Sequence, residues 1–238
     1  MRRYLVALLL STAAVAQTHI PATGLCNTGL TPASPLPTGC TTSTPVTPIN
    51  PTTGGSSVDG NWQLATPYPS ASYSSQTADP CKLTSFGPAW VDAPPSYWLN
   101  PDDGLSQWIS PQNDGYSMGG WFIYRTAFPV PPIKPGHDRY LLTVAGNVMG
   151  DDVVAAIFLR NPVFGCVPVS LPSLSPIVGS ESRFNVYTAW NPFDFAAVAT
   201  PDTMAYLYFL VYNLQMPDGE ANGTGFRVEF TSAYFTPE

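Results

Sequence analysis

The chain has 238 residues, a length that suits one domain or one domain with an extended appendage and excludes a fusion of two enzymes. Only 11% of the residues are charged, whereas 27 are Pro, 19 Gly, 12 Tyr, 12 Phe and 6 Trp, which favours an all-β protein over a helical or disordered one. The formal charge of -7 argues against nucleic acid and anionic membranes as partners, because phosphate groups attract clustered Lys and Arg.

Residues 1–16 have the pattern of a secretory signal peptide. Two arginines precede the apolar run 4–10, and small residues end at Ala16. The apolar run is shorter than the roughly 20 residues that a membrane span needs. We therefore expect a secreted protein, extracellular or periplasmic, that starts at Gln17 and has no membrane span after cleavage. An uncleaved N-terminal anchor is the alternative.

Residues 17–60 are a Pro/Thr-rich arm, with seven Pro, eleven Thr and no Lys or Arg. Such a segment neither sustains a helix nor buries much surface, so we expect a stalk or a wrapped arm. From residue 61 onwards, aromatic and β-branched runs recur between breaks of Pro, Gly, Asn and Asp. This pattern predicts a β-sandwich over 61–238.

Six strand patterns stand out in chain order: residues 121–128, 140–145, 153–160, 183–190, 204–212 and 225–235. With weaker strands near Trp62 and Trp108, the total is about eight, the number in an antiparallel jelly-roll sandwich.

Alternation within two of these strands predicts which faces are buried. The last strand has an apolar face of Phe226, Val228 and Phe230 and a polar face of Arg227, Glu229 and Thr231. We expect its polar face to be solvated. Residues 204–212 are apolar or aromatic on both faces, so we expect both to be buried or nearly so. We interpret the tyrosines of this strand as core, with a sugar-stacking platform as the alternative.

Four cysteines, Cys26, Cys40, Cys81 and Cys166, favour disulfides in an exported chain. Three connectivities are open. We favour Cys26–Cys40, because the segment between them has no core of its own and closing a loop of that size contributes roughly 3 kcal/mol. Cys81–Cys166 then follows by elimination. Zinc is the alternative, but there is no C-x-x-C pair and neither histidine has a ligand spacing, so we expect no such metal site.

Two strings together carry a resemblance to a known family: Ser106-Gln107-Trp108-Ile109-Ser110-Pro111 and Trp121-Phe122-Ile123-Tyr124-Arg125-Thr126-Ala127-Phe128. Further similarity lies at 24–30, 142–146 and 223–230. The chain resembles exported bacterial galactose-binding-like jelly-roll modules, of the kind found in proteins that carry the PEP-CTERM sorting signal. The resemblance covers most of the chain after the signal peptide. It implies an eight-stranded antiparallel sandwich and, by analogy, binding of carbohydrate or a cell surface.

The sequence departs from this family at three places. Residues 159–162 are Leu-Arg-Asn-Pro where the family usually turns on Leu-Asn-Gly, and a Pro-rich excursion with Cys166 follows. The C-terminus has no apolar sorting helix or basic tail, so we do not expect anchoring by that route. Cys26 occupies a common Phe position of the family, which is consistent with an added disulfide.

The resemblance also allows a structural Ca²⁺ ion near the last strand. Its candidate oxygen donors are Asn147, Asp151, Asp152 and Glu229. They are too few to specify a site, because Ca²⁺ takes six to eight oxygens. We expect no other cofactor.

Catalytic motifs are absent from the sequence. His19 and His137 fall in loop patterns, and no Gly-rich phosphate loop, H-E-x-x-H or G-x-S-x-G string occurs. The acidic doublets 102–103 and 151–152 cannot act alone as a glycosidase pair, because adjacent residues of an extended chain point to opposite sides. We therefore predict a protein that is not an enzyme.

The candidate ligand residues are aromatic and polar side chains in segments expected to be loops. A pyranose has an apolar face and a rim of hydroxyls, so a flat ring beside an amide or carboxylate suits it. We predict three stacking rings and three hydrogen-bonding groups: Trp90, Trp98 and Trp190, with Asn147, Asp151 and Asp152. The alternative is that the rings cap the open ends of the sandwich.

These features predict a binding module for a glycan or a cell-envelope polysaccharide. Two other functions are open. One is a structural or adhesive envelope protein with no sugar site, and the other is a hydrolase whose carboxylates converge only in three dimensions.

Overall fold

The computed structural model describes residues 18–35, 41–45, 58–68, 80–92, 105–162, 165–169, 190–214 and 216–238. The expected signal peptide, residues 183–189 of the expected strand 183–190, Cys40 and Trp98 lie outside these ranges. Among the described residues the only helical segment is a 3-10 turn, and none is long and apolar enough to cross a membrane. The all-β prediction is confirmed.

The described elements, in chain order, are β1 Ile20–Pro21, β2 Leu30–Pro35, β3 Thr41–Pro45, β4 Val58–Tyr68, η1 Pro80–Lys82, β5 Gly87–Val91, β6 Ile109–Ser110, β7 Tyr116–Ser117, β8 Gly120–Pro129, β9 Tyr140–Asp151, β10 Val153–Asn161, β11 Gly165–Val169, β12 Asn191–Ala199, β13 Met204–Asn213, β14 Asn222–Gly223 and β15 Gly225–Pro237.

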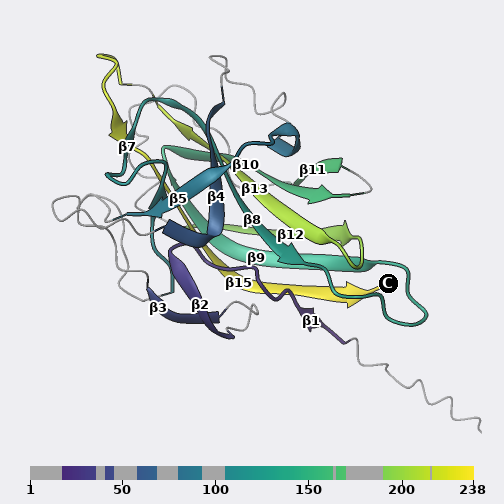
Figure 1. Ribbon diagram of the computed structural model, residues 1–238. Helices are drawn as coiled ribbons and strands as arrows, with labels where there is room; N and C mark the ends of the chain where they lie inside the picture. Colours follow the sequence, from purple (N-terminus) through teal and green to yellow (C-terminus); the bar gives the residue numbers. More distant parts are fainter. Residues whose placement is uncertain are drawn as a thin grey trace, which may run out of the picture.

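Eleven of the described strands form one antiparallel sheet in the order β11-β10-β13-β8-β4-β5-β6-β15-β9-β12, with β1 added to β15 (Figure 1). The sheet turns a corner at β4 and β5, whose register is interrupted between Val58 and Gln63. We call β11, β10, β13, β8 and β4 the first layer, and β5, β6, β15, β9 and β12 the second layer.

Aromatic side chains from both layers meet between them. Phe209 of β13 lies with its ring centroid 5.0 Å from that of Phe226 and 6.5 Å from that of Phe230, both on β15. Trp62 of β4 is stacked on Phe230 at 6.4 Å, and Phe193 of β12 closes the group at 6.0 Å from Phe209. Each such buried ring contributes about 1.5 to 3 kcal/mol through loss of water contact. The layers are therefore held as an all-β sandwich by one aromatic core.

Some strand boundaries differ from the sequence prediction. The segment from Asn191 onwards is strand β12, although Asn191-Pro192 has the composition of a turn. Among the described strands, β12 is the last in the sheet order, and Pro192 pairs with Asn147 of β9; a terminal strand is a position where Pro is tolerated. Strand β9 continues to Asp151, six residues beyond the predicted end.

The described part of the arm packs into the sandwich. Ala22 and Leu25 are fully buried members of the core. The side chain of Asn27 donates to the carbonyl of Leu105 and accepts from the amide of Phe230, both at 2.8 Å. Gly29, at a φ of 72°, lies so close to Gln107 that a Cβ there would be 2.4 Å from the Cβ of Gln107. Residues 22–29 of the arm thus pack on the sandwich, whereas β2 and β3 form a separate two-stranded sheet.

The first layer has a second apolar cluster on the face that points away from the core. It contains Trp121 and Ile123 of β8, Tyr208 and Leu210 of β13, and Phe158 of β10. The strand 204–212 is thus buried on both faces, as predicted, because Leu207, Phe209 and Val211 point into the core.

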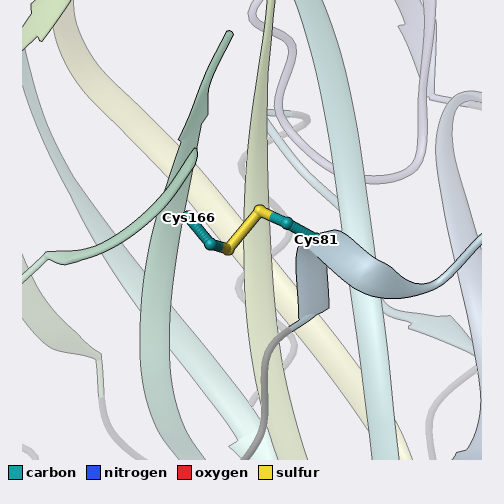
Figure 2. The surroundings of a disulfide bond; sticks show 2 residues. All are labelled: Cys81 and Cys166. Atoms are coloured by element: carbon teal, nitrogen blue, oxygen red, sulfur yellow. A yellow bond between two sulfur atoms is a disulfide. The ribbon is translucent and has the colours of Figure 1, made fainter. Parts of the chain in front are cut away.

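A short segment around η1 packs against this second cluster and is held by a disulfide. Cys81 of η1 is bonded to Cys166 of β11, with a Cα–Cα distance of 5.7 Å (Figure 2). Leu83 and Phe86 follow η1 and contact the cluster. This confirms the predicted Cys81–Cys166 pair. Cys26 is also disulfide-bonded, and its expected partner Cys40 lies outside the described residues.

Candidate functional site

Four of the five predicted ligand residues that the structure describes come from the second layer, in or directly beside its strands; the fifth, Asp152, lies in the turn between β9 and β10. Trp90 is in β5, Asn147 and Asp151 are in β9, and Trp190 directly precedes β12. The expectation that these segments are loops is wrong. Local composition, rich in Pro, Gly and Asn, suggested loops, but pairing with strands distant in sequence makes these segments extended.

Strand register places these residues in parallel rows across the second layer. Trp90 of β5 pairs with Ser110 of β6, and Asp151 of β9 pairs with Gly225 of β15. Because Ile109 pairs with Phe226, Gly225 lies opposite Ser110, so one row runs from Trp90 to Asp151. Three to four residues further along the strands, Asn147 pairs with both Glu229 and Pro192.

Four of the predicted residues, Trp90, Asn147, Asp151 and Trp190, lie on one face of this layer; Trp190 packs there on Met149. Their neighbours on the same strands, Val91, Val148, Gly150 and Phe226, lie on the face toward the core or in contact with it. Side chains alternate along a strand, so Trp90, Asn147, Asp151 and Arg227 point the other way. We call this the outer face of the second layer.

The centre of this face is a buried charged pair that the sequence analysis placed in solvent. Arg227 is 0% exposed. Its Nε donates to Oγ of Ser106 at 2.6 Å, and its Nη2 donates to the Ser106 carbonyl at 3.0 Å and lies 3.4 Å from Oε1 of Glu229. Ser106 also donates from Oγ to that carboxylate oxygen at 2.6 Å. The prediction that the polar face of this strand is solvated is therefore wrong at Arg227, because Ser106 and Glu229 replace water around the guanidinium charge.

Trp190 lies against this pair. The Cζ of Arg227 is 5.1 Å from the ring centroid of Trp190, a cation–π distance. The same ring packs on Trp108 and Met149, which are both 0% exposed, while Trp190 itself is partly exposed. One side of the indole is thus fixed by the protein, and part of its surface is open to solvent.

Asp152 differs from the other predicted residues. It is 7% exposed, and its backbone amide donates to the carbonyl of Tyr212 at 2.9 Å. Its Oδ2 accepts from the backbone amide of Leu214. These contacts join the β9–β10 turn to the end of β13 and do not point toward the outer face of the second layer.

The carboxylates of the outer face are far apart. Asp151 is four residues beyond Asn147 on β9, and Asn147 pairs with Glu229, so the Asp151 and Glu229 positions are separated by about 13 Å. A glycosidase pair needs about 5 to 9.5 Å between its carboxyl groups, and the register does not place Asp151 and Glu229 on directly paired positions. The candidate calcium donors also lie at two separate places: Asn147 beside Glu229, and Asp151 with Asp152 at the end of β9. Oxygen ligands of one Ca²⁺ ion all lie about 2.5 Å from it.

Among the described residues, no group of three or more His, Cys, Asp and Glu side chains has a metal-binding arrangement. His19 stacks on Tyr234 with 4.2 Å between the ring centroids, and His137 is exposed beside the turn at Gly136.

Sequence reasoning missed Arg227, Ser106 and Trp108 as parts of this face. One signal was present: Arg227 and Glu229 are two residues apart on a strand whose other face is apolar, so they are neighbours on one side. Nothing local indicated that Trp190 would lie on them.

No protein-family model matches this chain, and a search of curated proteins finds no match.

Proposed function

We propose that the protein is an exported, non-catalytic binding module for a glycan or cell-envelope polysaccharide, and that the outer face of the second layer is its site. The observation that carries the proposal is the register that brings Trp90, Asn147, Asp151 and Trp190 to one face of one sheet. These residues come from three separate stretches of the chain, which the sequence alone does not bring together.

The chemistry of this face suits a sugar. The Trp190 ring packs against Met149 and Trp108. Its side chain is thereby ordered before binding, so it loses little conformational entropy when a pyranose stacks on it. Asn147 lies two residues from Met149 along β9 and has both a donor and an acceptor for hydroxyl groups. The partly exposed Glu229 adds a carboxylate acceptor beside it.

Two further observations support the other parts of the proposal. The Cys81–Cys166 disulfide is typical of an oxidising compartment, which fits export. Asp151 and Glu229 are not cross-strand partners, which favours binding over glycoside hydrolysis.

A glycan array, followed by titration of any sugar that binds, tests this function on the wild-type protein and on Trp190→Ala. By analogy with stacking on other planar ligands, the substitution should remove about 1 to 3 kcal/mol of binding free energy and leave the melting temperature nearly unchanged. Tyr212→Ala is the matched control, because Tyr212 is a partly buried aromatic of β13 on the outer face of the first layer, on the opposite side of the sandwich.

Two results count against the proposal. If Trp190→Ala costs about 3 to 5 kcal/mol of stability and leaves glycan binding intact, Trp190 is only a packing residue. If the wild-type protein binds no glycan, the structural or adhesive alternative replaces this one.

A further inference from the structure

The outer face of the first layer has a row of stacked arginine and aromatic side chains. It consists of Phe86, which follows η1, Arg125 of β8, Tyr206 of β13 and Arg160 of β10, with Gln63 of β4 at its edge; we call it the arginine–aromatic face. It lies on the opposite side of the sandwich from the proposed glycan site, beside the disulfide of Figure 2.

The contacts along this row are cation–π contacts. The Cζ of Arg125 is 3.5 Å from the ring centroid of Phe86 and 5.5 Å from that of Tyr206. The Cζ of Arg160 is 5.8 Å from the same Tyr206 ring. Tyr206 therefore lies between two guanidinium groups.

Stacking on the aromatic rings orients the guanidinium groups of Arg125 and Arg160 and leaves some of their N–H donors available. Arg125 uses Nε to donate to Oε1 of Gln63 at 2.8 Å. In the part of the chain that the structure describes, neither Arg125 nor Arg160 forms an ion pair. Arg160 is exposed and Arg125 is partly exposed. Each guanidinium thus has N–H groups that can meet a planar anion in a bidentate arrangement.

The charge of this layer is opposite to that of the whole chain. The sequences of β4, β8, β10, β11, β13 and the segment 80–86 contain Lys82, Arg125 and Arg160 and one acidic residue, Asp59 of β4, which is 2% exposed. The chain as a whole has a formal charge of -7. Charges more than about 8 Å away are largely screened at physiological salt, so a bound anion responds mainly to this local positive charge.

We infer that the arginine–aromatic face binds a polysaccharide that carries carboxylate groups, such as a polymer of uronic acids. Arg125 and Arg160 would each pair with a carboxylate, and the exposed part of the Tyr206 ring between them would contact the apolar face of a sugar. A chain of pyranose rings with regularly placed carboxylates matches this order of groups. An acidic polypeptide supplies the carboxylates on flexible side chains but has no rings to place on Tyr206.

Binding of polygalacturonate to the full chain, measured by calorimetry, tests this inference. We expect Arg160→Gln to weaken binding about fivefold, which corresponds to one partly exposed ion pair, and to leave the fold intact because Arg160 is exposed. Arg139→Gln is the matched control. It removes the same charge from a site where Arg139 is already paired with Glu238 at 3.1 Å, and its affinity should equal that of the wild type.

Methyl-esterified polygalacturonate has the same rings without the charge and should bind at least fivefold more weakly. Trp190→Ala should bind polygalacturonate as the wild type does, so failure of this site and failure of the proposed glycan site can be told apart. The inference is overturned if polygalacturonate does not bind, if Arg139→Gln weakens binding as much as Arg160→Gln, or if polyglutamate binds as well as polygalacturonate.

Discussion

At the scale of single residues, Asp59 is a buried carboxyl group that joins the arm to β4. Its Oδ2 accepts from the amide of Gly29 at 2.6 Å, and its Oδ1 accepts from the amides of Asn61 and Trp62 at 2.8 and 3.2 Å. Burial outweighs these hydrogen bonds and raises the pKa of Asp59 from 3.8 to about 6. The folded protein therefore holds this proton more tightly than the unfolded chain does.

This difference predicts that Asp59 makes the protein less stable as pH rises. Stability is lost from about pH 3.8, where the group ionises in the unfolded chain, until about pH 6, where it ionises in the folded protein. The loss between pH 3 and pH 7 should be about 3 kcal/mol. Urea unfolding across this range should show that Asp59→Asn lacks this contribution, whereas Asp194→Asn, at an exposed position, keeps it. Equal pH profiles for the wild type and Asp59→Asn would contradict the prediction.

Arg227 is the second residue with a strong individual effect. Replacement by Met leaves Glu229 and Ser106 without its guanidinium, and the free energy of unfolding should fall by about 3 kcal/mol. The double variant Arg227→Met/Glu229→Met should recover much of this loss, because it leaves no uncompensated charge. Urea denaturation of both variants measures the difference, and equal losses in the two would show that the charge pair is not the cause.

At the scale of elements, the disulfide links the segment around η1 to β11 of the first layer. The loop between Cys81 and Cys166 spans 85 residues, so its closure restricts the unfolded chain strongly. Replacing both cysteines by Ser should lower the free energy of unfolding by about 2 to 4 kcal/mol. Hydrogen exchange should speed up in η1 and β11 more than in β9 and β15. Uniform exchange throughout the sandwich would contradict this local role.

At the scale of the whole molecule, the arm is part of the folded unit. Thr28 donates from Oγ1 to the carbonyl of Gln107 at 2.6 Å and accepts from the amide of Val228 at 3.2 Å, and Asn27 makes the equivalent pair of bonds to Leu105 and Phe230. Asn27 and Thr28 thus connect β15 with the segment that precedes β6.

Asn27→Ala should therefore lower the free energy of unfolding by about 1 to 3 kcal/mol, because it leaves a buried amide and a carbonyl without partners. Thermal or urea unfolding measures this. Thr18→Ala is the control, since Thr18 is exposed and accepts a surface hydrogen bond from Lys134; its effect should stay within about 0.5 kcal/mol. An equally small effect at Asn27 would mean that the arm does not stabilise the sandwich.

The sequence by itself determined the fold class and the two faces of individual strands. Alternation along a strand is a local property, so the apolar set Phe226, Val228 and Phe230 could be assigned to the core without knowing its partners. The Cys81–Cys166 pair followed from counting four cysteines and removing one local pair.

Only the tertiary structure decided which residues share a face and which are covered. Trp90 and Asp151 lie in line because β6 and β15 stand between them, and Arg227 is buried because Ser106 and Trp190 reach it from distant parts of the chain. Strand register between segments about a hundred residues apart depends on how both layers pack together. Local composition does not specify this register. The segments around Trp90, Asn147 and Trp190 are rich in Pro, Gly and Asn and were therefore predicted as loops, although pairing with distant strands makes them extended.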